Sequence, residues 1–304
     1  MVEQKLTEPR LPASSLPVAD HPPLAVVYTW VFLAVFAASI EPIIVKLGYR
    51  GAVTPLQLLV IKNLFAAVAI LPLTRKFVWL GSKSALEILS VSLLLLANNA
   101  CVLMALQSLT AVSLITIITT TPALVGIVNQ KLGRDILGSK FWLGFLLCFS
   151  GVIISLEPAS MAFDAIGVVF ALMAVATSTV YRVRMEDMTA KYTPPVVSTY
   201  VFLLNGLFTL MFLLPFVGAI PQPSLMMGGA LGVAAAIANF AFLYALNLVG
   251  STKISIVNMV QRPLVIIIAA LMLKEALGIL QVAGIIMVLV GIQIASVKRV
   301  KKQS

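Results

Sequence analysis

In the stretch LKEALGILQVAGIIMVLVGIQI, residues 273–294, the charged residues Lys274 and Glu275 stand at the start. No charged side chain follows them until Lys298. An apolar run of about 20 residues is long enough to cross the hydrocarbon core of a bilayer as a helix. The whole chain shares this character, because its 304 residues are 61% hydrophobic and 11% charged, with a mean hydropathy of +1.07. Soluble domains average roughly 25% charged residues. The sequence therefore predicts an integral membrane protein.

Proline, glycine and charged residues divide the chain into ten candidate spans. These are 24–47, 55–75, 85–107, 111–130, 139–157, 165–183, 195–217, 225–248, 252–273 and 277–297. Connections are short, and an open sheet cannot satisfy its backbone in lipid. We therefore expect an all-α polytopic membrane protein. Residues 1–23 are predicted to form a disordered cytoplasmic tail, and residues 298–304 a basic cytoplasmic tail that contacts anionic lipid.

The net charge of +10 would suggest a nucleic-acid partner in a soluble protein, but here the excess cations lie between apolar runs. Lysines and arginines in short loops mark the cytoplasmic side of a membrane protein. With the N-terminus inside, sixteen fall on that side: Lys5, Arg10, Arg75, Lys76, Lys83, Lys131, Arg134, Lys140, Arg182, Arg184, Lys191, Lys253, Lys298, Arg299, Lys301 and Lys302. The outer side has only Lys46, Arg50 and Lys274. Both termini are thus predicted to be cytoplasmic, in a plasma or organelle membrane, and no nucleic acid is expected.

The chain also repeats itself. A shift of 140 residues matches Pro55 with Pro195, Asn99 with Asn239, Gly144 with Gly284 and Gly151 with Gly291, and Pro122 matches Pro263 after a one-residue slip. Each half, 24–157 and 163–297, contains five spans. Because five is odd, the second half enters the membrane upside down, which predicts two inverted five-helix repeats with a site between them near the midplane.

The closing stretch resembles the signature of the drug/metabolite transporter superfamily, in its EamA-type branch. Glu275, Gln281, Gly284 and Gly291 fit that pattern, and residues 132–154 are a looser copy with Asp135 for the acid and Phe141 in place of Gln. The branch often has Arg in its second span, where this chain has Lys62. The resemblance covers roughly residues 26–297. It implies a carrier for small polar metabolites or amino acids, commonly an exporter.

Glu41 lies deep in the first span and is followed directly by Pro42. We place it about 8 Å outward of the midplane, inside a half-thickness of about 15 Å. Charges at this depth normally face a cavity or a partner, and a carboxylate buried alone favours its neutral form, which suits a proton carrier. Glu41 also resembles the first-span Glu of small multidrug pumps, distant relatives in the superfamily. Pro42 cannot donate to the helix ladder, so a freed carbonyl could line the cavity. The alternative is a structural ion pair with Lys62, which lies at a similar depth.

Arg262 lies at the centre of the ninth span and precedes Pro263. Ser255, Asn258 and Arg262 share one helix face, with Gln261 beside them. A guanidinium suits a carboxylate or phosphate, and organic-phosphate translocators of the same superfamily also use basic residues in late spans. We therefore predict substrate contact by Asn258, Gln261 and Arg262. The alternative for Arg262 is a counter-ion for Glu41.

Other polar residues in the spans extend the candidate site. Asn98, Asn99 and Asn239 suit either ligand binding or bonds between helices, and Tyr181, opposite Glu41 in the repeat, is either a substrate contact or an interfacial anchor. Thr116 and Thr119 to Thr121 are expected to bond their own helix carbonyls. Glycines seven residues apart favour close helix contact, within the chain or in a homodimer. The substrate-binding set is Lys62, Asn99, Tyr181, Asn239, Asn258, Gln261 and Arg262, with Glu41 for proton coupling.

These residues favour a secondary carrier that moves a small anionic or zwitterionic metabolite by alternating access, coupled to protons or to exchange. Candidates include an amino acid, an organic acid or a phosphorylated metabolite. Two alternatives are a receptor or scaffold that does not transport, and a proton-coupled exporter of cationic amphiphilic compounds. The spans offer no nucleophile–base pair and His21 is the only histidine, so we expect neither an enzyme nor a cofactor or metal.

Overall fold

The structure, a computed structural model, describes residues 24–50, 53–74, 81–109, 111–155, 164–273, 278–295 and 297–299. The predicted N-terminal tail, Lys274 and Glu275, and residues 300–304 of the basic tail lie outside this part of the chain. The statements that follow concern the described residues.

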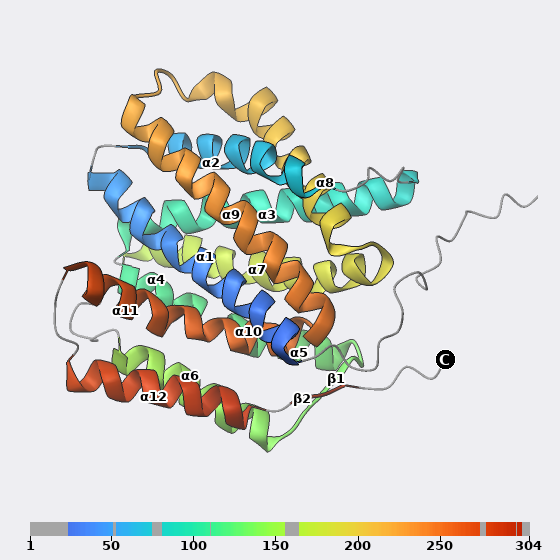
Figure 1. The fold of residues 1–304 in the computed structure, drawn as a ribbon, viewed down its shortest axis with the longest axis vertical. Helices are drawn as coiled ribbons and strands as arrows, with labels where there is room; N and C mark the ends of the chain where they lie inside the picture. Colours follow the sequence, from blue (N-terminus) through green and yellow to red (C-terminus); the bar gives the residue numbers. More distant parts are fainter. Residues whose placement is uncertain are drawn as a thin grey trace, which may run out of the picture.

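Each of the ten predicted ranges contains one or more helices in its described part (Figure 1). In chain order the helices are α1 (Leu24–Arg50), α2 (Pro55–Ile70) with the 3-10 turn η1 (Leu71–Leu73), α3 (Ser82–Ser108), α4 (Ala111–Ile118), α5 (Thr121–Lys131), α6 (Ser139–Ser155), α7 (Ala165–Lys191), α8 (Pro194–Phe208) continued by η3 (Thr209–Leu213) and η4 (Leu214–Phe216), α9 (Gln222–Val249), α10 (Ser251–Val257), η5 (Asn258–Val260), α11 (Gln261–Leu273) and α12 (Ile279–Ile294). Within the described ranges, five helices are long and apolar enough to cross a membrane, namely Ser82–Ser108, Ser113–Lys131, Ala165–Lys191, Pro194–Phe216 and Gln222–Val249.

The described residues are mostly helical, as expected for an all-α membrane protein, and two short strands lie at one end of the molecule. Strands β1 (Asp135–Leu137) and β2 (Val297–Arg299) pair antiparallel, with Asp135 opposite Arg299. The predicted last span therefore ends too late, because α12 stops at Ile294 and the chain turns into β2. Each strand has three residues, too short to show an alternating pattern in the sequence. The pairing brings the segment after α5 and the segment after α12 to the same end of the molecule (Figure 1).

The helices pack in pairs that keep their pattern when the two halves are exchanged. Helix α1 packs against α9, and α3 packs against α7. The repeat mate of α1 is α7 and the repeat mate of α9 is α3, so replacing each helix by its mate turns the first pair into the second. The mates α2 and α8 contact each other, and so do α6 and α12, which lie side by side at one edge of the bundle (Figure 1). The helices that a shift of 140 residues relates to each other therefore have corresponding neighbours.

Glycines form the contact between α6 and α12. A Cβ added to Gly284 would lie 2.5 Å from the carbonyl oxygen of Gly151, and one added to Gly151 would lie 2.7 Å from the carbonyl oxygen of Gly284. Cβ atoms do not approach other atoms this closely, so only glycine lets the two backbones meet here. The predicted close contact thus lies within one chain. A homodimer stays a prediction.

The fourth and ninth predicted spans are each interrupted just before a proline. Helix α4 ends at Ile118 and α5 begins at Thr121, ahead of Pro122, while η5 separates α10 from α11 ahead of Pro263. Proline cannot donate to the carbonyl four residues earlier, and the Thr121 hydroxyl donates to that freed carbonyl of Ile118 at 2.7 Å. The Thr119 and Thr120 hydroxyls also donate to carbonyls of their own helix, as predicted.

Candidate functional site

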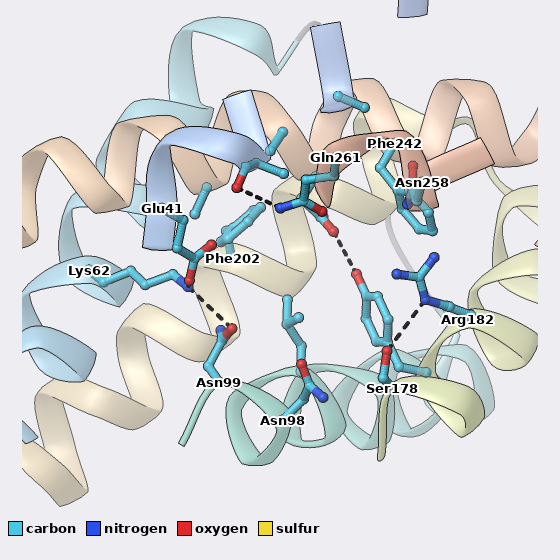
Figure 2. Close-up of a pocket in the computed structure, with 17 residues that line it drawn as sticks. Glu41, Lys62, Asn98, Asn99, Ser178, Arg182, Phe202, Phe242, Asn258 and Gln261 are labelled. Atoms are coloured by element: carbon cyan, nitrogen blue, oxygen red, sulfur yellow. Dashed lines mark hydrogen bonds and ion pairs between the residues drawn. The ribbon is translucent and has the colours of Figure 1, made fainter. Parts of the chain in front are cut away.

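A cavity of about 170 Å³ lies between helices of both halves (Figure 2). Helices α1, α2 and α3 of the first half and α7, α8, α9, η5 and α11 of the second half contribute to its wall. Seven of the eight predicted site residues line it: Glu41, Lys62, Asn99, Tyr181, Asn239, Asn258 and Gln261. Side chains up to 220 positions apart in the sequence therefore meet around one space.

Lys62 and Glu41 form an ion pair at one side of the cavity, as the structural alternative predicted. The Lys62 side chain is 4% exposed, and its Nζ also donates to Oδ1 of Asn99 at 3.2 Å. A buried ammonium needs both a counter-ion and hydrogen-bond acceptors to offset its lost hydration. Glu41 is 31% exposed and faces the cavity. The pair is thus held by three helices of the first half and is accessible from its acidic side.

The carbonyl freed by Pro42 is also at the cavity. A proline at position 42 leaves the carbonyl of Ala38 without its helical donor, although α1 continues helically through this position. Nε2 of Gln261 donates to this Ala38 oxygen at 2.7 Å (Figure 2). Ala38 and Gln261 both line the cavity. The prediction that a freed carbonyl would line the cavity is therefore confirmed, with Gln261 as its partner.

Asn239 and Tyr181 form a second polar pair in the cavity wall. The Tyr181 hydroxyl donates to Oδ1 of Asn239 at 2.8 Å, while Nδ2 of Asn239 is buried without a protein partner. Tyr181 is 6% exposed, so its interpretation as an interfacial anchor is wrong. Asn98, in contrast, donates to the carbonyl of Ala174 at 2.7 Å and so ties α3 to α7.

Arg182 is the site residue that sequence reasoning missed. The sequence prediction counts it among the cytoplasmic cations because it is the first charge at the end of the sixth predicted span, but α7 continues to Lys191 and Arg182 lines the cavity. Its Nε donates to the Ser178 hydroxyl at 3.3 Å, and its guanidinium carbon lies 5.0 Å from the ring centroid of Phe242. The buried Met185 and Met188 continue the core face of α7 past the arginine, and this apolar spacing is the signal that could have placed it.

Arg262 is the predicted site residue that does not line this cavity. It lines a second, smaller cavity of about 30 Å³ together with Ser255 and Asn258, so the three residues do share a face as predicted. Arg182, Asn258 and Gln261 line both cavities, which are therefore adjacent. Arg262 is not the counter-ion of Glu41, because Glu41 pairs with Lys62.

The composition of the cavity wall is suited to binding a small molecule. Within the described residues, no group of three His, Cys, Asp or Glu side chains could hold a metal ion. The cavity instead combines amides, hydroxyls and charged groups with apolar walls that include Phe202 and Phe242. A few polar groups placed in an apolar cavity are typical of a small-molecule site.

Comparison with known proteins gives the fold of the chain and the family of its second half. No curated protein matches the chain. Among solved structures, twenty-eight chains match, and one titled "Crystal structure of protein" superposes with a TM-score of 0.71 at 14% identity, covering 89% of this chain and 96% of that chain. At this identity the likeness shows the fold alone. Residues 165–297, from α7 to β2, match the model of the EamA-like transporter family. The second half of the chain is therefore an EamA-like transporter domain of the drug/metabolite transporter superfamily, in an integral membrane protein.

Proposed function

We propose that this protein is a secondary carrier that moves a small anionic or zwitterionic metabolite across a membrane by alternating access. The EamA-like domain indicates a membrane transporter of this superfamily. The observation that carries the proposal is the central cavity, because charged and amide side chains from both halves meet there. Rocking one half against the other would expose such a site alternately to the two sides of the membrane.

Ten spans in two inverted five-helix halves, with both termini cytoplasmic, are part of this proposal. The contacts that persist when the halves are exchanged support it, as does the position of the cavity between them. The breaks before Pro122 and Pro263 support it further. Interrupted helices at membrane depth are tolerated where they line a cavity, and both breaks adjoin the smaller cavity.

The charges in the two cavities favour an anionic or zwitterionic solute over a cationic one. Lys62 and Glu41 compensate each other, whereas Arg182 and Arg262 add positive charge. The central cavity, at about 170 Å³, is also smaller than the roughly 300–1,000 Å³ of sites that hold drug-sized ligands. Both observations favour a small metabolite over a cationic amphiphilic compound.

Glu41 is proposed as the proton-coupling residue. Its partial exposure at the cavity lets a proton reach the carboxylate, and protonation would remove the counter-ion of the buried Lys62. Lys62 would then need a different anion, which a substrate can supply. Protonation and substrate binding are coupled in this scheme through one ammonium group.

The experiment that tests the proposal is a two-step solute screen. Purified protein is first tested by thermal shift against amino acids, organic acids and sugar phosphates, because a ligand that binds only the folded state raises stability by about 2.7 kcal/mol at 100 times its Kd. Each hit is then measured for counterflow in proteoliposomes preloaded with the same solute. We expect at least one anionic or zwitterionic hit that undergoes counterflow. Binding without flux for every hit would indicate a receptor and would contradict the proposal.

A further inference from the structure

Two guanidinium groups meet at the boundary between the two cavities. Arg182 of α7 lines both cavities, and Arg262 of α11 lines the smaller one. Both side chains therefore face the smaller cavity, where their like charges repel each other. Figure 2 shows Arg182 on the side of the central cavity opposite Lys62 and Glu41. The cavity therefore has two chemically different sides, one with a compensated ion pair and one with arginine.

Neither arginine has a carboxylate partner among the described residues. The ion pairs in that part of the chain join Lys62 to Glu41, Arg134 to Asp187 and Lys191 to Glu87. Arg182 instead contacts neutral groups, namely the hydroxyls of Ser178 and Ser255, at 3.3 and 3.4 Å, and the ring of Phe242. Two neighbouring cations in a low-dielectric interior are costly without an anion. This cost is what a bound substrate would remove.

The charges of the cavity residues determine how many negative charges a substrate needs to neutralise them. Since Glu41 compensates Lys62, the charged residues that line the two cavities leave two positive charges, on Arg182 and Arg262. A monoanion would leave one guanidinium uncompensated, whereas a dianion would satisfy both. Guanidinium groups bind carboxylate and phosphate oxygens through two parallel hydrogen bonds, so two of them can engage one multivalent anion.

We propose that Arg182 and Arg262 together form a subsite for the doubly negative end of the substrate, either a phosphomonoester group or two neighbouring carboxylates. The inference rests on the proposed function and narrows its substrate class to dianions. The hydroxyl of Ser255, which lines the smaller cavity and accepts from Arg182, orients that guanidinium. The remainder of the substrate would extend into the central cavity, toward the side that Lys62 and Glu41 line.

The test compares binding of probes that differ in charge to the full-length protein in detergent. The probes are glycerol 3-phosphate and inorganic phosphate, malonate and succinate, monoanionic acetate and lactate, and zwitterionic alanine. We expect one dianion class to bind at least about 30-fold more tightly than the monoanions, a ratio typical of a buried charge pair. Comparing the phosphate probes with malonate and succinate shows whether the two negative charges of the substrate belong to a phosphate group or to two carboxylates. Equal affinities for dianions and monoanions would overturn the inference.

Single-charge variants separate a binding role from a structural one. Arg182→Gln and Arg262→Gln each remove one positive charge, so each should lose the preference for dianions while keeping monoanion binding. Arg184→Gln is the matched control, because Arg184 lies on the same helix and is exposed. A variant that weakens every probe equally would contradict the inference. If dianions bind through both arginines but no solute is transported, the proposed function fails and the subsite stands; if zwitterions are transported without any dianion preference, the reverse holds.

Discussion

The side-chain amide of Gln261 donates a hydrogen bond of 2.7 Å to the backbone carbonyl of Ala38. The bond joins α11 of the second half to α1 of the first, at the carbonyl that lacks a helical donor because residue 42 is proline. Pro42 and Gln261 each adjoin a charged residue in the sequence, since Glu41 precedes Pro42 and Arg262 follows Gln261. The hydrogen bond that Pro42 removes from helix α1 is therefore replaced by one that joins the two halves.

Replacing Gln261 with Leu should destabilise the protein by about 1–3 kcal/mol, because the Ala38 carbonyl in the cavity wall loses its side-chain donor. In a Pro42→Ala background the new N–H at position 42 can satisfy that carbonyl, and the cost should fall. Denaturation of the four proteins in micelles gives the coupling energy. Gln293→Leu, at an exposed position of α12, is the control. If Gln261→Leu lowers the free energy of unfolding equally in both backgrounds, Gln261 does not compensate for the donor that Pro42 lacks.

Removing Glu41 should cost more stability than removing Lys62. Glu41→Gln leaves the 4% exposed ammonium of Lys62 without its counter-ion, whereas Lys62→Met leaves a carboxylate that is 31% exposed. Breaking a buried pair costs about 3–5 kcal/mol, and the partial exposure of Glu41 lowers this figure. The double variant should recover much of the loss. Glu87→Gln, in the exposed pair with Lys191, should change stability by about 0–1 kcal/mol. A larger loss of stability in Lys62→Met than in Glu41→Gln would contradict the finding that Lys62 is the more deeply buried partner.

Glu41→Gln should also abolish the pH dependence of transport while the protein remains folded, because the amide cannot take up a proton at the cavity. The measurement is uptake into proteoliposomes with and without an imposed proton gradient. Residual uptake of the variant should be the same under both conditions. If the gradient stimulates the variant as it does the natural protein, Glu41 is only the structural partner of Lys62.

The sequence predicted where most helices lie. It predicted less completely which side chains meet at the cavity. Depth along a span placed Glu41 near Lys62, and repeat mates placed Asn99 and Asn239 near one cavity. Depth does not give the rotation of a helix or its neighbours, so the choice between Lys62 and Arg262 as partner of Glu41 stayed open. Arg182 was missed because a charge at the end of an apolar run is counted with the adjoining loop, whereas α7 continues to Lys191 with Met185 and Met188 buried. The pairing of β1 with β2 depends on two segments far apart in the sequence, which local patterns cannot detect.

Replacing Gly284 with Ala should destabilise the contact between α6 and α12. The added Cβ would lie 2.5 Å from the carbonyl oxygen of Gly151, so the two helices must separate. Overpacking of this kind costs about 1–3 kcal/mol. Gly138→Ala is the control, since no atom lies within 4 Å of its added Cβ, and its stability should change by less than about 0.5 kcal/mol. Thermal unfolding in micelles measures both, and a neutral Gly284→Ala would show that the helices do not meet as closely as described.

The central claim is that the cavity between the two halves is the site through which solute passes, and Ala238→Trp tests it most directly. Ala238 lines the cavity on α9, so an indole there should fill the space, whereas Ala230→Trp places the same side chain on the exposed face of the same helix. The measurement is counterflow of the solute found by the binding screen, in proteoliposomes that contain equal amounts of each folded variant. The account predicts that Ala238→Trp abolishes counterflow and that Ala230→Trp retains it. Counterflow by Ala238→Trp at the rate of the natural protein would contradict the claim.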